Sequence, residues 1–183
     1  MTIKQQILIS GVGGQGVLFV TRLLAEAAMM KGFPVLTSET HGMAQRGGTV
    51  VSHLKVGDFS SPLIRPFSAD GLLALKPESL SQHGVFVKPG GWAIVNSSQP
   101  LQQFDELMIA SIDADSLART IGNLKSVNLI MLGAALSKLS GTQDLFCTLA
   151  DIQAVLNTQI SGSPLKLEKF TAAIDAGYRV QQI

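Results

Sequence analysis

The sequence of 183 residues has one cysteine, Cys147, and few charged side chains. A single thiol excludes a disulfide framework, a cysteine-rich zinc site and a self-contained iron–sulfur cluster, which needs about four thiolates. Charged residues make up 15% of the chain and the formal net charge is +1. This balance gives no electrostatic basis for binding nucleic acid or an anionic membrane.

Long hydrophobic runs are also missing. No apolar stretch approaches the ~20 residues of a membrane-spanning helix, and the stretch before Gly11 is too short for the core of a signal peptide. We therefore expect a cytoplasmic protein. With a mean hydropathy of +0.32, the chain has too few charges to cover its own surface, which indicates that part of this surface meets a partner. A very well-packed monomer is the alternative.

The length predicts one domain, residues 1–183, because domains average ~150 residues. Short β-rich segments predict strands at 7–9, 33–37, 49–56, 72–75, 92–95 and within 107–112. Helical spacing predicts helices at 17–31, for about ten residues from 77, and at 115–121, 127–139, 149–160 and 164–181. This alternation predicts a three-layer α/β fold with a mostly parallel sheet and a helical C-terminal part. We expect the first two strands to be parallel, with a right-handed crossover.

A glycine turn follows the first strand and makes this opening unit Rossmann-like. Residues 11–16 read Gly-Val-Gly-Gly-Gln-Gly, which satisfies the G-x-G-x-x-G pattern in its strand-to-helix context. Glycines allow close approach of a ligand, and free amides at a helix start favour an anion. A dinucleotide fold also requires an acidic residue near the end of the second strand, and Glu39 lies slightly late for that role. The turn is either a nucleotide or phosphate site, or a structural or partner contact.

The segment 37–48 is the second candidate, and we expect residues 38–48 to form a loop. It gathers Glu39, His41 and Arg46 among glycines in an otherwise charge-poor stretch. An arginine fork suits a carboxylate or phosphate, and a histidine titrates near neutral pH. The alternative is structural: a Glu39–Arg46 salt bridge that holds the loop, with His41 as a hydrogen-bonding support.

Other chemistry has little support. His53 fits a strand histidine and His83 a helix surface, so the sequence predicts no metal site and no catalytic residue in this chain. Cys147 lacks the surroundings of a reactive thiol. The predicted ligand or partner contacts are Gly11, Gly13, Gly14, Gln15, Gly16, Glu39, His41, Met43, Gln45, Arg46, Gly47 and Gly48.

Together, the GVGGQG turn and the segment SETHGMAQRGGTVVSH resemble the gamma subunit family of 2-oxoacid:ferredoxin oxidoreductases. This family includes pyruvate and ketoisovalerate oxidoreductase gamma subunits and the small beta subunit of indolepyruvate oxidoreductase. Later segments also fit its spacing: LKPESL from residue 75, KPGG from residue 88, the helix containing Asn128, and the closing AGY from residue 176. The similarity therefore extends over nearly the whole chain.

The resemblance implies a subunit of a complex that oxidatively decarboxylates a 2-oxoacid, such as pyruvate or indolepyruvate, and is inactive alone. Such a complex uses thiamine diphosphate, Mg²⁺, coenzyme A and 4Fe–4S clusters, and it reduces ferredoxin. The resemblance places these cofactors in the alpha, beta and cluster-bearing partner subunits. The sequence is consistent with this placement of the cofactors, since it lacks the cysteine spacing that binds clusters and a Gly-Asp-Gly segment that binds magnesium and diphosphate.

Two other functions remain open. The first is a free-standing Rossmann-type oxidoreductase that uses NAD or a related nucleotide, although the chain leaves little space for a substrate domain. The second is a homodimeric binding module whose apolar surface is self-complementary.

Overall fold

The computed structural model describes residues 3–42, 48–101, 106–141 and 145–180, without the side chain of His41. Its strands are β1 (Gln5–Val12), β2 (Val35–His41), β3 (Thr49–Val56), β4 (Ala69–Ala74), β5 (Val87–Asn96) and β6 (Met108–Ile112). Its α-helices are α1 (Val17–Met30), α2 (Glu78–His83), α3 (Ala114–Thr120), α4 (Val127–Leu139), α5 (Leu149–Gln159) and α6 (Pro164–Arg179). Two short 3₁₀ helices, η1 (Gly84–Phe86) and η2 (Leu124–Ser126), connect them.

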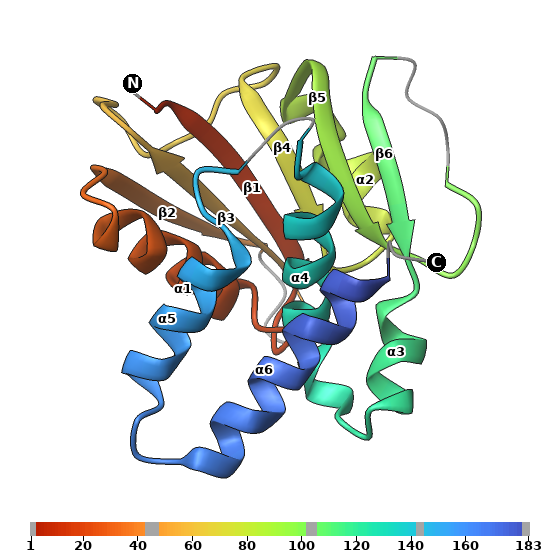
Figure 1. The fold of residues 1–183 in the computed structure, drawn as a ribbon. Coiled ribbons are helices and arrows are strands. Elements are labelled where there is room, and N and C mark those ends of the chain that lie inside the picture. The colour runs from red at the N-terminus through yellow and green to blue at the C-terminus, as the bar shows by residue number, and fades with distance from the viewer. Residues whose placement is uncertain (1–2, 43–47, 102–105, 142–144, 181–183) are drawn as a thin grey trace.

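The six described strands form one sheet in the order β2-β3-β1-β4-β5-β6 (Figure 1). β1, β4, β5 and β6 pair in parallel, whereas β3 pairs antiparallel with both β1 and β2. The mostly parallel sheet is therefore confirmed. The first two strands do run in the same direction, but they are not neighbours, because β3 lies between them.

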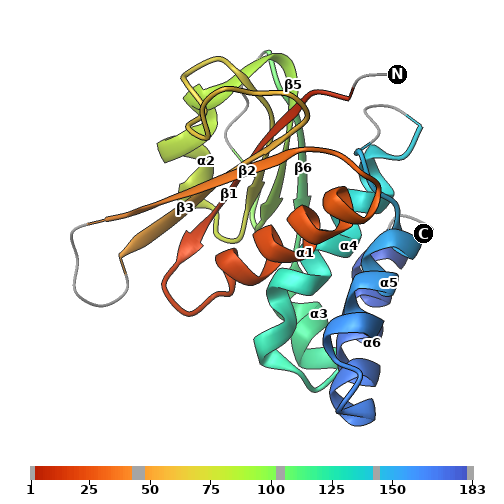
Figure 2. The same ribbon diagram turned by 90° about the vertical axis from the view of Figure 1, so that its left-hand side faces the viewer.

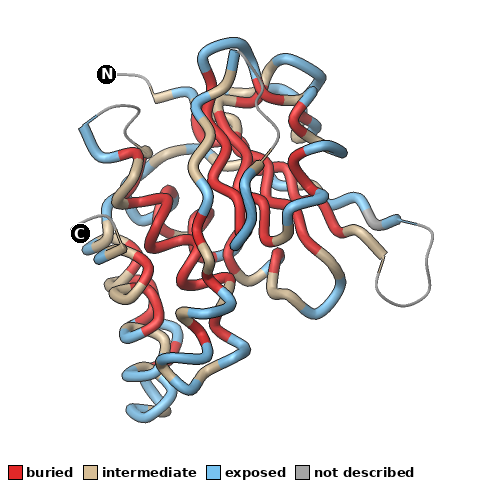
Figure 3. The backbone as a smooth tube through the Cα atoms, turned by 90° about the vertical axis from the view of Figure 1, so that its right-hand side faces the viewer, coloured by how far each residue is buried: buried red, intermediate tan, exposed pale blue. Residues whose placement is uncertain are grey.

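Helices cover both faces of the sheet, which confirms the three-layer α/β class. α1, α3, α4, α5 and α6 lie on one side, and α2 lies on the other (Figure 2). The central strand β1 supplies both cores: Ile7 and Ile9 belong to the larger hydrophobic cluster under α1 and α4, and Leu8 belongs to the smaller one under α2. Figure 3 shows the resulting continuous buried band along the sheet.

β2 and β3 form a hairpin that the sequence did not predict. β2 continues to His41, so residues 38–41, expected in a loop, are a strand that pairs along its length with β3; Glu39 lies opposite Ser52. The expectation failed because the unbroken polar run at residues 37–41 resembles a loop when no neighbouring strand is known, whereas an edge strand tolerates such a run.

The nearly uncharged α4 is buried inside the protein, because α6 crosses it closely on the side away from the sheet. A Cβ atom on Gly133 would lie 2.0 Å from the Ile174 carbonyl oxygen, and one on Gly177 would lie 1.9 Å from the Ile130 carbonyl oxygen. Two glycines thus allow the backbones of the helices to touch. Within the described ranges, no helix is both long enough and apolar enough to cross a membrane.

The close crossing of α4 and α6 predicts that replacing one of these glycines lowers the free energy of unfolding. Gly177→Ala should lower the free energy of unfolding by about 2 kcal/mol or more, because the helices must separate. Alanine at an uncrowded helical position would instead stabilise by up to about 1 kcal/mol. The measurement is urea unfolding, with Gly162→Ala as the control; Gly162 lies in the turn between α5 and α6, where a Cβ meets no atom within 4 Å and crowding should cost nothing. A Gly177→Ala protein as stable as the control would contradict the close crossing.

Candidate functional site

The glycine turn lies at the carboxyl edge of β1 and is fixed by α4. Gly16 begins α1 with a φ of 78°, a left-handed conformation that favours glycine. Its carbonyl oxygen accepts a hydrogen bond from Asn128 Nδ2 at 3.3 Å. A Cβ on Gly16 would lie 2.3 Å from the same nitrogen, so a side chain there would displace the Asn128 amide in addition to straining the backbone. Asn128 was not predicted to contact the turn, although an amide in an apolar helix, here buried, is a signal for such a role.

The Gln15 side chain closes the turn from within. Its Oε1 accepts a hydrogen bond from the Val12 amide at 2.8 Å, and its Nε2 donates to the Leu75 carbonyl oxygen at 3.4 Å. A Cβ on Gly11 would lie 2.7 Å from Gln15 Oε1, so the glycine makes room for this arrangement. Gln15, predicted as a contact residue, thus bonds to the protein's own backbone in the structure.

The Leu75 carbonyl oxygen lies near the place where doubly wound proteins bind dinucleotides. β1 and β4 are neighbours, and their following helices α1 and α2 lie on opposite faces, which defines a topological switch point at the carboxyl edge. Here Leu75 O accepts from both Gln15 Nε2 and Asn96 Nδ2, the latter at 3.2 Å. Asn96 Nδ2 also donates to Asp115 Oδ2 at 2.8 Å. The Gln15 and Asn96 side chains therefore bond to the protein's own groups at this switch point.

Glu39 does not take the position of a ribose-binding acid. It lies on the edge strand β2, and the intervening β3 puts it two strand spacings, about 10 Å, from β1. Its side chain is exposed. The geometry thus lacks the second element of a dinucleotide fingerprint.

The structure brings the two predicted segments together. The Gly13 amide donates to the Gly48 carbonyl oxygen at 3.1 Å, and the Gly42 amide donates to Thr49 O at 2.8 Å. The end of the β2–β3 hairpin therefore lies against the glycine turn (Figure 2). The other predicted contacts of this segment, Met43, Gln45, Arg46 and Gly47, lie outside the described residues, as does the proposed Glu39–Arg46 salt bridge.

An apolar pocket opens beside the turn. It has a volume of about 460 Å³, and its walls include Gly13, Gly14, Leu18 and Val50. Gly13 and Gly14 are exposed, with space for a Cβ at both, and Leu18 is 39% exposed. Because the first turn of α1 also has amides without partners in the helix, this surface offers apolar contacts next to hydrogen-bond donors. We call Gly13, Gly14, Leu18 and Gly48 the turn surface.

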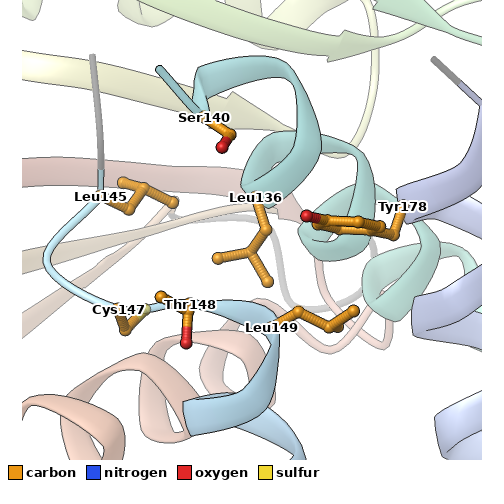
Figure 4. A pocket seen from close by; sticks show the side chains of 7 residues that line it. All are labelled: Leu136, Ser140, Leu145, Cys147, Thr148, Leu149 and Tyr178. Atoms are coloured by element: carbon orange, nitrogen blue, oxygen red, sulfur yellow. The ribbon is translucent and has the colours of Figure 1, made fainter. Parts of the chain in front are cut away.

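A second pocket, of about 350 Å³, lies between α4, α5 and α6 and contains the cysteine (Figure 4). Burial raises the pKa of the Cys147 thiol to about 12, with a further contribution from Asp151. The thiol is therefore protonated near neutral pH and is a poor nucleophile. Within the described ranges, no three His, Cys, Asp or Glu side chains gather in a way that could hold a metal ion.

Two histidines have described side chains: His83 is the last residue of α2, and His53 lies on β3. His53 is a buried strand residue, as the sequence predicted, and its Nδ1 accepts a hydrogen bond from the Ile64 amide at 3.2 Å. His83 is half-buried, with Nδ1 3.2 Å from Ser10 Oγ. Burial is the largest cause that lowers the pKa of each ring, so both are neutral at physiological pH. They support the packing of α2 and lie away from the turn surface.

Comparisons with known proteins give a consistent result. The family described as pyruvate ferredoxin/flavodoxin oxidoreductase matches residues 6–180. The IorB subunit of indolepyruvate oxidoreductase from Archaeoglobus fulgidus is 31% identical over 71% of this chain and 75% of its own length. The common gamma subunit of pyruvate/ketoisovalerate oxidoreductases from Thermococcus litoralis is 29% identical over 70% of this chain and 75% of its own.

Solved structures agree in fold. The gamma subunit of a keto/oxoacid ferredoxin oxidoreductase from Geobacter sulfurreducens superposes with a TM-score of 0.76, 23% identity and 96% coverage of both chains. A 2-oxoglutarate:ferredoxin oxidoreductase from Magnetococcus marinus, with 2-oxoglutarate, coenzyme A and succinyl-CoA bound, superposes with a TM-score of 0.78 and 20% identity. The superposed region covers 97% of this chain but only 31% of that longer polypeptide.

The hydrogen bonds of Gln15 predict a structural role for its side chain. Gln15→Met should lower the free energy of unfolding by about 1–3 kcal/mol, because the Val12 amide loses its acceptor. Chemical denaturation measures the loss. Gln82→Met, at an exposed position on α2, is the control and should stay within about 0.5 kcal/mol of the parent. Equal stability of the two variants would show that the turn does not depend on Gln15.

Proposed function

The chain belongs to the pyruvate ferredoxin/flavodoxin oxidoreductase family, and from this premise we propose that it is the gamma-type subunit of a thiamine-diphosphate-dependent complex. Its relatives are subunits of 2-oxoacid oxidoreductases. The complex would convert a 2-oxoacid, coenzyme A and oxidised ferredoxin into acyl-CoA, carbon dioxide and reduced ferredoxin. The alpha, beta and cluster-bearing partners would hold the redox and thiamine cofactors, and this chain would be inactive alone.

One observation supports this role more than any other: the glycine turn and the hairpin end meet in a single exposed surface. The hydrogen bond from Gly13 to Gly48 joins them, and the adjoining pocket is lined by apolar side chains, including the exposed Leu18. An exposed apolar patch rimmed by backbone donors is typical of a protein–protein contact. We propose that the turn surface contacts the thiamine-binding subunits and helps to enclose their active site.

We propose a second, narrower role at the same surface, in binding coenzyme A. The amides at the start of α1 are suited to a phosphate group because the helix dipole favours negative charge there. Arg46, on the adjoining segment, would add a planar donor. Coenzyme A is named as a bound molecule in the longer Magnetococcus relative.

The free-standing nucleotide-binding oxidoreductase is not favoured. At the switch point Gln15 and Asn96 donate hydrogen bonds to Leu75 O, and Glu39 lies two strands from β1. The family match and the relatives also point to a subunit.

Leu18 tests the docking role. When this chain is co-expressed with its thiamine-binding partners, Leu18→Asp should weaken co-purification by about tenfold or more, because a carboxylate would be buried against an apolar contact. Leu18 is the second residue of α1, where an aspartate favours the helix, so folding should not suffer.

The matched control is Leu165→Asp, at the second residue of α6, where the leucine is 63% exposed. The start of α6 lies at the far tip of the helical layer (Figure 2), and its substitution should leave co-purification unchanged. Loss of the complex with both variants, or with neither, would remove the turn surface as the docking site.

Arg46 tests the coenzyme A role in the assembled complex. Arg46→Ala should raise the apparent KM for coenzyme A several-fold, since one charge-assisted contact to a phosphate contributes about 1.5–3 kcal/mol, and should leave the KM for the 2-oxoacid unchanged. Initial rates with each substrate varied separately give both values. A change confined to the 2-oxoacid would reject contact with coenzyme A.

A further inference from the structure

Two lysines share one aromatic ring at the amino edge of β1, opposite the turn surface. Lys4 Nζ lies 5.3 Å and Lys55 Nζ 5.1 Å from the centroid of the Phe59 ring. Lys4 immediately precedes β1, Lys55 lies near the end of β3, and Phe59 follows that strand. The N-terminus and the β3–β4 connection lie together at this end of the sheet (Figure 1). Both ammonium groups thus lie near the same ring.

The arrangement is built into the backbone. Gly57 has a φ of 113°, and a Cβ there would lie 2.1 Å from the Ile3 carbonyl oxygen. Its amide donates to Pro34 O at 2.8 Å. The close approach that glycine permits brings the segment containing Lys4 against the segment that leads to Phe59. The two lysines are therefore positioned by the fold and not only by flexible side chains.

Within the described ranges, no ion pair neutralises the positive charges of this group, and the Phe59 ring is the partner that the two lysines share. Lys55 is only 8% exposed, yet neither lysine forms an ion pair in the described part of the chain. Burial, and then the nearby charge of Arg65, lower the pKa of Lys55. Asp58, the acidic residue next to Phe59, is exposed and forms no ion pair in the same ranges. Holding like charges together without an anion is unfavourable.

We propose that Lys4 and Lys55, which lie over the Phe59 ring, together with Arg65 form a binding site for a phosphate group. A phosphate carries close to two negative charges near neutral pH and several acceptor oxygens. It therefore offsets three neighbouring cations better than a carboxylate does. The exposed guanidinium of Arg65 supplies a planar pair of donors, and the lysines act as point charges. This site is independent of the proposed assembly at the turn surface.

Isothermal titration of the full chain at constant ionic strength tests the proposal with three probes: inorganic phosphate, adenosine diphosphate and acetate. We expect saturable phosphate binding in the millimolar range and acetate at least about tenfold weaker. Adenosine diphosphate that binds more tightly than phosphate would identify a nucleotide as the source of the group, and equal affinity would identify free phosphate. No saturable binding of either, or acetate equal to phosphate, would overturn the proposal.

Lys55→Met locates the binding because methionine keeps an unbranched apolar stem and removes the charge. It should weaken phosphate binding by about tenfold or more, and it should raise the melting temperature without phosphate. Lys166→Met is the matched control, since Lys166 also lies over a ring, 5.4 Å from the centroid of Phe170, but is exposed. It should bind phosphate like the parent.

Arg65→Gln, at an exposed position, provides a second variant that does not disturb the core. Like Lys55→Met, it should weaken phosphate binding. If both variants retained the affinity of the parent chain, the phosphate would be bound elsewhere and the site would be rejected.

Discussion

The carbonyl oxygen of Leu75 accepts hydrogen bonds from two side chains, Gln15 and Asn96, and the carboxyl edge of the sheet is organised around this junction. The bond from Gln15 sets the path of the chain after β1, and the bond from Asn96 connects β4 to the end of β5. Because both amides donate to the protein's own backbone at the switch point between β1 and β4, the opening unit has the glycine pattern of a nucleotide site while these side chains are engaged within the protein. The exposed outer side of the turn is left as the surface available to another molecule.

Most of the fold could be predicted from residue patterns alone. Short β-branched runs separated by helical periodicity were sufficient to identify an α/β domain, since the two periods differ and a parallel sheet requires crossovers. Strand order was not accessible in this way. Nothing local to residues 33–56 indicates that β3 returns between β1 and β2, because the pairing depends on contacts across the sheet. Because β3 lies between β1 and β2, Glu39 is an exposed residue on an edge strand and not a possible ribose ligand.

The candidate site was predictable in location and less so in chemistry. A glycine pattern identifies where the backbone turns tightly, and Gly16 does adopt the left-handed conformation that such a pattern predicts. It does not identify what fills the space around the turn. Gln15 looked like a ligand contact because polar side chains in glycine turns often point outward, whereas its amide matches one donor and one acceptor of the neighbouring backbone. Asn128 illustrates the converse, since its partner, Gly16 O, is 112 residues away in sequence.

A low overall charge makes the distribution of the charges that remain informative. The turn surface is apolar and has backbone donors, which suits a large partner that excludes water, because burying few charges keeps the desolvation cost low. The amino edge of β1 has the opposite character, with cations gathered at a ring and one of them, Lys55, mostly buried. Clustering like charges lowers stability, so a fold that fixes them with a glycine contact gains most when an anion is bound. The two edges of one sheet are thereby suited to different partners, a protein at one edge and a small anion at the other.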